Sequence, residues 1–214
     1  MKKLYFILFF LISSFISYGQ KVFLGGNGNN EWSNAANWQG GSKPAANSTT
    51  ANKVVIKAAT VLVDEDAFAA QIKKADHNIG GSSYNTVITA SNNATLTITG
   101  RGEGTSIAIW NAEGGKDLKF DLPVVMKKYQ NEVYEQIRLS VAGVASVTFG
   151  SNSTLTLENN VRVTGSFGNR RVNFNGTLTG AKQIQIDGGI DITPQNNNDQ
   201  NTSKGSSANP NTVQ

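Results

Sequence analysis

The sequence predicts an all-β protein that folds as a right-handed parallel β-helix, a solenoid of stacked coils with a cap over its N-terminal end. Short runs of Thr, Val and Ile alternate apolar with polar residues, which is the period of a half-buried strand. The connections are mostly one to five residues rich in Gly, Asn and Ser, which tolerate positive φ and form tight bends. One formula recurs as "ATLTITG", "STLTLEN", "GTLTG" and "VRVTG", at a spacing of roughly 20 residues that is typical of stacked repeats. The spacing is irregular, so a β-sandwich stays open as an alternative.

The candidate strands follow one another along most of the chain. In a parallel β-helix, their inward side chains stack on those of the coil below, which accounts for the small alternating apolar residues and the Asn at the turns. Two segments also fit helical spacing. We expect residues 64–75 to be extended because they lie between strands at strand spacing, whereas residues 126–137 fit a helix and a strand equally well. The expected strands are 53–58, 60–65, 85–90, 94–100, 105–110, 117–126, 137–143, 145–150, 153–159, 161–167, 171–180 and 182–193.

The first 19 residues have the three parts of a secretory signal. A positive start precedes an apolar run at residues 4–16, and "SYG" (17–19) offers small residues at positions −3 and −1. The apolar run is shorter than the about 20 residues that cross a bilayer. We therefore expect residues 1–19 to be cleaved, and the mature protein to be secreted or displayed on the outer cell surface without a membrane span.

The other end of the sequence, residues 194–214, is polar and holds one sizeable apolar side chain, Val213. Such a segment cannot bury enough surface to offset the entropy of ordering, so we expect a disordered tail or linker. It either shields the last edge of the ladder or joins a longer surface protein of which this chain is a fragment. The β-helix domain is then residues 20–193, with its cap at about 25–52.

Composition narrows the classes of function. The chain has no cysteine, which excludes disulfides and thiolate metal sites. Its formal charge is +4, and loss of Lys2 and Lys3 with the signal halves that value. A chain so close to neutral does not suggest the clustered basic face of a nucleic-acid-binding protein, so we expect no nucleic-acid partner.

The segment "GGNGNNEWSNAANWQGGSKPAANSTTANKVVIKA" (25–58) contains W-S-x-x-x-N-W, G-x-x-P and V-x-I in this order. The matching residues are Trp32, Ser33, Asn37, Trp38, Gly41, Pro44, Val54 and Ile56. With the later "TLTITG"-like repeats, this resembles secreted bacterial β-helix surface proteins, a group that includes autotransporter passengers and adhesin-like proteins of gliding bacteria. The resemblance implies a β-helix with a surface or adhesive role. The chain departs from relatives in gliding bacteria, which often end in a β-rich sorting domain, so it is either truncated or released by another route.

Two of the three tryptophans lie in "EWSNAANWQGGSKP" (31–44), just before the first regular strands. A solenoid needs a cap over its first coil, and this position favours Trp32 and Trp38 as the side chains that close it. The competing interpretation is a carbohydrate platform of Trp32, Asn37 and Trp38, in which exposed rings bind the apolar face of a sugar. Trp110 is expected to be an isolated surface or coil-end aromatic residue.

No catalytic constellation stands out among the carboxylates. A glycoside hydrolase needs two of them at a suitable separation. "DED" (64–66) is the one cluster in sequence, and strand alternation would direct its members to opposite faces, so a solvated turn is the expected role. The single histidine, His77, has no partner motif. We expect no metal site and no cofactor, and the sequence leans away from an enzyme without settling the question.

These observations favour a secreted or cell-surface structural and adhesion module. Its expected partners are surface glycans or other cell-surface proteins. The alternative is a carbohydrate-active protein, either a polysaccharide binder or a lyase, because β-helices also carry such activities and a fold alone does not decide function.

Overall fold

The computed structural model describes residues 20–45, 52–74, 84–100, 107–111, 116–127, 136–142, 145–166, 170–186, 190–194 and 211–213. The predicted signal, His77 and residues 195–210 of the predicted tail lie outside these ranges. All structural statements below concern the described residues.

Three sheets form the body of the protein. Sheet A has eight strands in the order β1-β2-β5-β8-β11-β14-β17-β19, sheet B has six in the order β3-β6-β9-β12-β15-β18, and sheet C has five in the order β4-β7-β10-β13-β16. Sheet A consists of β1 (Lys21–Phe23), β2 (Lys53–Ile56), β5 (Gln71–Lys73), β8 (Ile107–Asn111), β11 (Gln136–Ala142), β14 (Asn160–Ser166), β17 (Ile184–Ile186) and β19 (Asn211–Val213). Sheet B consists of β3 (Thr60–Val63), β6 (Thr86–Ala90), β9 (Asp117–Asp121), β12 (Ser146–Phe149), β15 (Arg170–Phe174) and β18 (Ile190–Pro194). Sheet C consists of β4 (Ala67–Ala69), β7 (Leu96–Ile98), β10 (Val124–Met126), β13 (Thr154–Leu157) and β16 (Thr177–Thr179).

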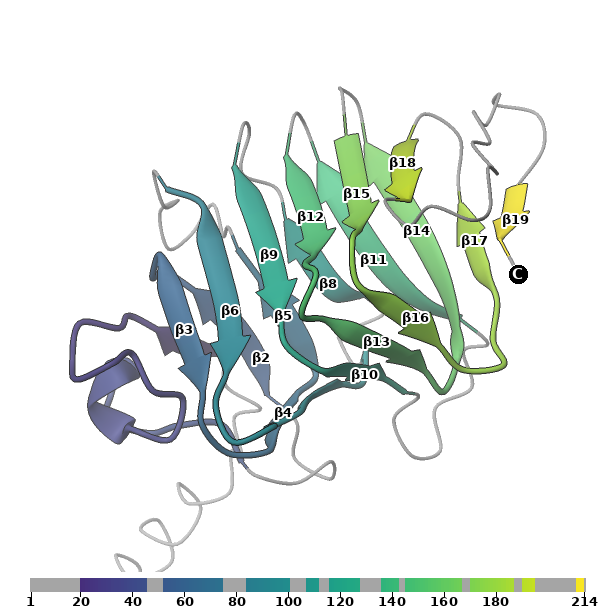
Figure 1. The fold of residues 1–214 in the computed structure, drawn as a ribbon. Coiled ribbons are helices and arrows are strands. Elements are labelled where there is room, and N and C mark those ends of the chain that lie inside the picture. The colour runs from purple at the N-terminus through teal and green to yellow at the C-terminus, as the bar shows by residue number, and fades with distance from the viewer. Residues whose placement is uncertain are drawn as a thin grey trace, which may run out of the picture.

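The chain visits the three sheets in turn, so each strand from β2 onwards pairs in parallel with the strand three elements later. In Figure 1 it descends along sheet B at the front, crosses below along sheet C and returns behind along sheet A, while it advances from the purple end to the yellow end. This path is a right-handed winding. The predicted parallel β-helix is therefore confirmed, and the antiparallel hairpins of a sandwich are not the architecture of the described strands.

The inward side chains form continuous apolar columns along the solenoid. Sheet A contributes Ile72, Ile109, Leu139 and Val163, and the columns merge into one buried core. Sheet B adds a stack of three aromatic rings, in which Phe120 and Phe149 lie 5.4 Å apart and Phe149 and Phe174 lie 5.3 Å apart between centroids. In-register parallel pairing places the same strand position of each coil at the same depth, so the period of two seen in the sequence becomes a dry interior.

The predicted coil length of roughly 20 residues is too short. In sheet C, Val124 pairs with Leu155, 31 residues later, and Leu155 pairs with Leu178, 23 residues later. The error arises because the recurring motifs belong to different sheets: "STLTLEN" supplies β13 in sheet C, whereas "VRVTG" supplies β14 in sheet A of the following coil. One coil needs three strands and three corners.

The two segments that fitted helical spacing resolve differently. Residues 64–75 contain β4 and β5, so the expected extended conformation is confirmed where the segment is described. Met126 ends β10 and Gln136 begins β11, while residues 128–135 between them lie outside the described ranges.

Part of the predicted tail is present in the ladder. Residues 211–213 form β19, which pairs antiparallel with β17, with Ile184 beside Val213 and Ile186 beside Asn211. Every other named strand pair is parallel, so β19 occupies the edge of sheet A as a different kind of strand. This position matches the shielding alternative for that short segment, and the disorder predicted for residues 195–210 stays a prediction.

Candidate functional site

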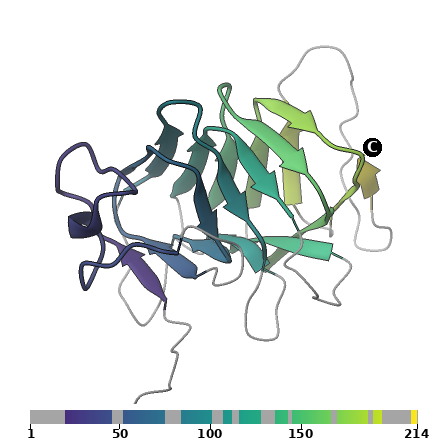
Figure 2. The ribbon, with the colours of Figure 1, turned by 90° about the horizontal axis from the view of Figure 1, so that it is seen from below.

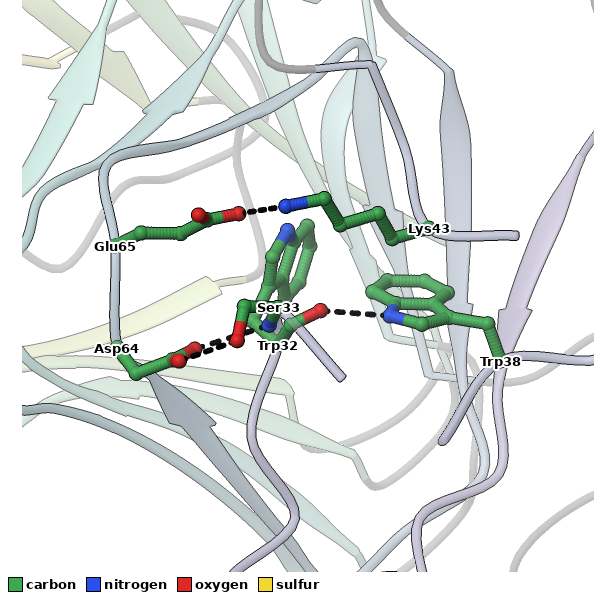
Figure 3. Close-up of polar contacts among 6 residues, drawn as sticks. All are labelled: Trp32, Ser33, Trp38, Lys43, Asp64 and Glu65. Carbon is green, nitrogen blue, oxygen red and sulfur yellow. Dashed lines mark hydrogen bonds and ion pairs between the residues drawn. The ribbon is translucent and has the colours of Figure 1, made fainter. Parts of the chain in front are cut away.

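The segment that the sequence singles out lies at the N-terminal end of the solenoid (Figure 2, purple). Trp32 and Trp38 are each only 2 % exposed. Their ring centroids are 4.8 Å apart with the planes at 83°, and Phe23 of β1 lies 5.0 Å from Trp38 in a second edge-to-face contact. The indole Nε1 of Trp38 donates a hydrogen bond to the carbonyl oxygen of Trp32 at 2.7 Å (Figure 3). The three rings form a compact aromatic cluster over the first coil.

Local sequence chemistry shapes the turn between the two tryptophans. A 3₁₀ helix, η1 (Ala35–Asn37), begins after Asn34, whose side chain accepts a hydrogen bond from the backbone N–H of Ala36 at 3.0 Å. Asn37 is fully buried; its Oδ1 accepts from the backbone N–H of Asn27 at 2.9 Å, and its Nδ2 donates to the carbonyl of Glu31 at 3.0 Å. Asn37 therefore links two loop segments.

Backbone pairing fastens this segment to the first complete coil. The N–H of Trp32 donates to the carbonyl of Leu62 at 2.7 Å, and the N–H of Leu62 donates to the carbonyl of Asn30 at 2.9 Å. On another side of the solenoid, β1 pairs in parallel with β2. The segment thus closes the end of the core from sheets A and B together, and the predicted N-terminal cap is confirmed.

Burial also bears on the proposed carbohydrate platform. Trp32, Asn37 and Trp38 do lie together, as that interpretation requires. Their side chains are directed into the molecule, and the ring faces of the tryptophans contact each other, Phe23 and the core. A sugar would reach these rings only after the cap had opened, so the geometry of this cluster favours packing over ligand binding.

The acidic cluster "DED" connects the cap to the ladder, a role that the sequence did not reveal. Asp64 accepts hydrogen bonds from both the N–H and the hydroxyl of Ser33, at 3.0 and 2.5 Å (Figure 3). Glu65 forms an ion pair with Lys43, which also belongs to the N-terminal segment. Asp66 accepts from the backbone N–H of Thr95 in the next coil at 2.9 Å. Alternation does send Asp64 and Asp66 to different partners, but the turn is a junction of three segments.

The surroundings of Asp64 lower its pKa. Burial acts in the opposite direction and is the largest influence, but it is outweighed by the combined effect of the two hydrogen bonds from Ser33, the backbone N–H of Asp64 itself and the charge of Lys43. A pKa lower in the folded than in the unfolded chain means that the unfolded state takes up the proton first as the pH falls. The stabilisation is complete above about pH 4, the ordinary range for an aspartate, and is lost as the pH falls through the folded pKa.

Replacing Ser33 with alanine should expose this dependence. At pH 7, we expect S33A to lower the free energy of unfolding by about 0.5–1.5 kcal/mol, because one hydrogen bond to Asp64 is lost. The difference from the parent chain should shrink as the pH falls below 4 in a series of thermal melts. Glu65→Gln is the matched control, since its ion pair is partly exposed and such pairs contribute about 0–1 kcal/mol. An equal S33A effect at pH 7 and pH 3 would contradict the assignment.

Other carboxylates on the outer surface act as struts between neighbouring coils. Asp117 accepts hydrogen bonds from the hydroxyls of Ser146 and Thr148 at 2.8 and 3.0 Å. Asp121 accepts from the N–H and the side-chain amide of Asn152, and its carboxylate lies 3.5 Å from the amine of Lys119. Among the described residues, no group of three or more His, Cys, Asp or Glu side chains is placed to hold a metal ion.

A fully buried lysine is the titratable group that sequence reasoning missed. Lys74 follows β5 at an inward position, and its Nζ donates to the carbonyl of Tyr84 at 2.6 Å and to the hydroxyl of Thr86 at 3.0 Å. The same nitrogen lies 5.4 Å from the centroid of the Tyr84 ring. The alternation "QIKK", with Ile72 inward, is the signal that would have placed Lys74 inside. Its contacts join sheets A and B at a corner.

The comparisons with known proteins add no relative. No protein-family model matches the sequence, and neither the curated proteins nor the solved structures contain a match. Within the described ranges, no helix has the length and apolar character needed to cross a membrane.

Proposed function

We propose that the protein is a secreted or cell-surface structural and adhesion module that works through the outer faces of its solenoid, without catalysis. The observation that carries this proposal is the use made of its carboxylates. Asp66, Asp117 and Asp121, which a β-helix enzyme would need as acids or bases, each accept hydrogen bonds from a neighbouring coil. Acidic groups used in this way hold the coils in register and build a stiff scaffold.

The place of action follows from the sequence. The signal-like residues 1–19 support export, and the resemblance of residues 25–58 to bacterial β-helix surface proteins supports display at the cell surface. A stiff ladder capped at one end is suited to holding a binding surface away from a membrane or within a matrix. Surface glycans and other surface proteins are the partners that we expect.

The competing class is a polysaccharide lyase or hydrolase, and a turnover assay separates the two. The purified chain is incubated with a panel of neutral and acidic polysaccharides, and new reducing ends and unsaturated products are measured. We expect no turnover, together with recovery of the protein in the surface or secreted fraction of expressing cells. Turnover that disappears in Asp117→Asn or Asp121→Asn, but not in Glu65→Gln, would refute the structural proposal.

A further inference from the structure

The three sheets differ in charge, although each has the same parallel construction. The described strands of sheet A carry five basic residues and no acidic residue; the basic residues are Lys21, Lys53, Lys73, Arg138 and Arg162. The strands of sheet C carry no charge, and those of sheet B mix both signs. Winding therefore collects positive charge on one side of the solenoid.

Three of these cations lie on the outer face of sheet A. Lys53, Lys73 and Arg162 are partly exposed, and each is flanked along its strand by buried inward residues such as Val54, Ile72 and Val163. Lys73 and Arg162 are three strand spacings apart, which is about 14 Å. Cations at this spacing match the repeated charges of an extended polymer better than a single small anion.

An aromatic ring lies between them. The strand register builds an outer row across the sheet, in which Lys73 pairs with Trp110, Trp110 with Ser140, and Ser140 with Thr164. The amine of Lys73 lies 4.2 Å from the centroid of the Trp110 ring, so the cation covers one side of the ring. The next two members of the row, Ser140 and Thr164, have short side chains that carry hydroxyl groups. The row thus combines a cation, an aromatic face and hydrogen-bonding groups.

We propose that the outer face of sheet A binds an extended anionic polysaccharide, with Trp110 against a sugar ring and Lys53, Lys73 and Arg162 along its acidic groups. The ligand carries carboxylate groups, as a uronic acid polymer does, or sulfate groups. The inference deepens the proposed surface function and rests on it, because such polymers lie outside the cell. It also corrects the expectation that no basic face is present.

Charge complementarity selects this partner over other polyanions. A membrane-binding face would add large exposed apolar side chains for insertion. The described large apolar side chains that are most exposed, Leu24, Tyr84 and Leu178, lie outside the strands of sheet A. A nucleic-acid site would gather its cations more densely, since affinity there grows with the number of phosphates neutralised. The aromatic ring and hydroxyl groups fit the mixed apolar and polar surface of a sugar.

Binding of the purified chain to polygalacturonate, a sulfated galactan and a neutral glucan tests the proposal, by titration calorimetry and affinity electrophoresis. We expect binding to at least one anionic polymer, weaker at higher salt, and none to the neutral glucan. The two anionic polymers distinguish carboxylate from sulfate recognition. Lys73→Glu combined with Arg162→Glu should weaken binding about tenfold or more, and Trp110→Ala about tenfold, as for the loss of one or two charge-assisted or stacking contacts.

The control reverses a charge on another sheet. Arg171 is exposed on sheet B, and Arg171→Glu should change affinity by less than about twofold. Melting temperatures and circular dichroism verify that all variants are folded. The inference is overturned by failure to bind either anionic polymer, by equal losses in Arg171→Glu, or by equal affinity for DNA or anionic lipid vesicles together with no effect of Trp110→Ala. Glycan binding that survives Lys73→Glu/Arg162→Glu refutes the sheet A site and leaves the proposed function standing, whereas turnover refutes the proposed function.

Discussion

Replacing Trp38 with alanine should lower the free energy of unfolding by about 3–5 kcal/mol, the range for deleting a buried aromatic side chain. The ring is 2 % exposed, contacts Phe23 and Trp32, and donates the hydrogen bond that satisfies the carbonyl of Trp32. Its removal leaves a cavity at the end of the core and an unpaired carbonyl. Because coils of a solenoid support one another only through their neighbours, loss of the cap should also expose the first coil to fraying.

Chemical denaturation followed by circular dichroism measures the effect, and two variants bracket it. Trp38→Phe keeps much of the packing but loses the Nε1 donor, so it should cost less than Trp38→Ala. Trp110→Ala removes the same side chain from a partly exposed outer position and should cost about 1 kcal/mol or less. A cost below about 1 kcal/mol for Trp38→Ala would mean that the cluster does not close the solenoid.

Phe149→Ala should destabilise the middle of the ladder by a similar amount, about 3–5 kcal/mol. Phe149 is 1 % exposed and is held between Phe120 in the preceding coil and Phe174 in the following one. Stacked aromatic pairs add about 0.5–1.5 kcal/mol beyond the area that they bury, and this variant breaks two such pairs. The cavity lies between coils on both sides, where the backbone ladder limits collapse.

Leu178→Ala is the matched control for Phe149→Ala. Leu178 continues an inward column of sheet C, but it is 42 % exposed, so its truncation should cost about 1 kcal/mol or less. Phe149→Leu, which refills part of the space, should recover part of the loss. Equal denaturation midpoints for Phe149→Ala and Leu178→Ala would contradict the view that buried columns provide most of the stability.

Strands are readable from this sequence because their signal is local. In "ATLTITG", Leu96 and Ile98 alternate with threonines, and this period of two is sufficient to place β7 and the inward side chains. Parallel stacking was also predictable, because repeated Thr-apolar runs joined by short Gly- and Asn-rich turns favour coils. Coil length was not, because a repeat in the sequence does not state which of three sheets it enters.

The candidate site divides in the same way. The position of "EWSNAANWQGGSKP" before the first strands predicted a cap, and Trp32 and Trp38 form one. Their burial depends on Phe23 and on coil residues from Val54 onwards, which no local pattern assigns to them. Likewise, Asp64 and Asp66 are two residues apart, yet one bonds to Ser33 and the other to Thr95, since a corner of the solenoid brings both segments to it.

The charge of the outer faces depends most on the winding. Composition shows only a small net positive charge, and Lys53 and Arg162 are 109 residues apart in the sequence. In-register parallel pairing sends every third strand to the same sheet, so cations spread along the chain gather on sheet A while the acids of Asp117 and Asp121 lie on sheet B. Alternation along each strand is a property of neighbouring residues and is legible in the sequence. Neighbours across strands are set by how many residues each corner takes up, and only the tertiary structure decides that.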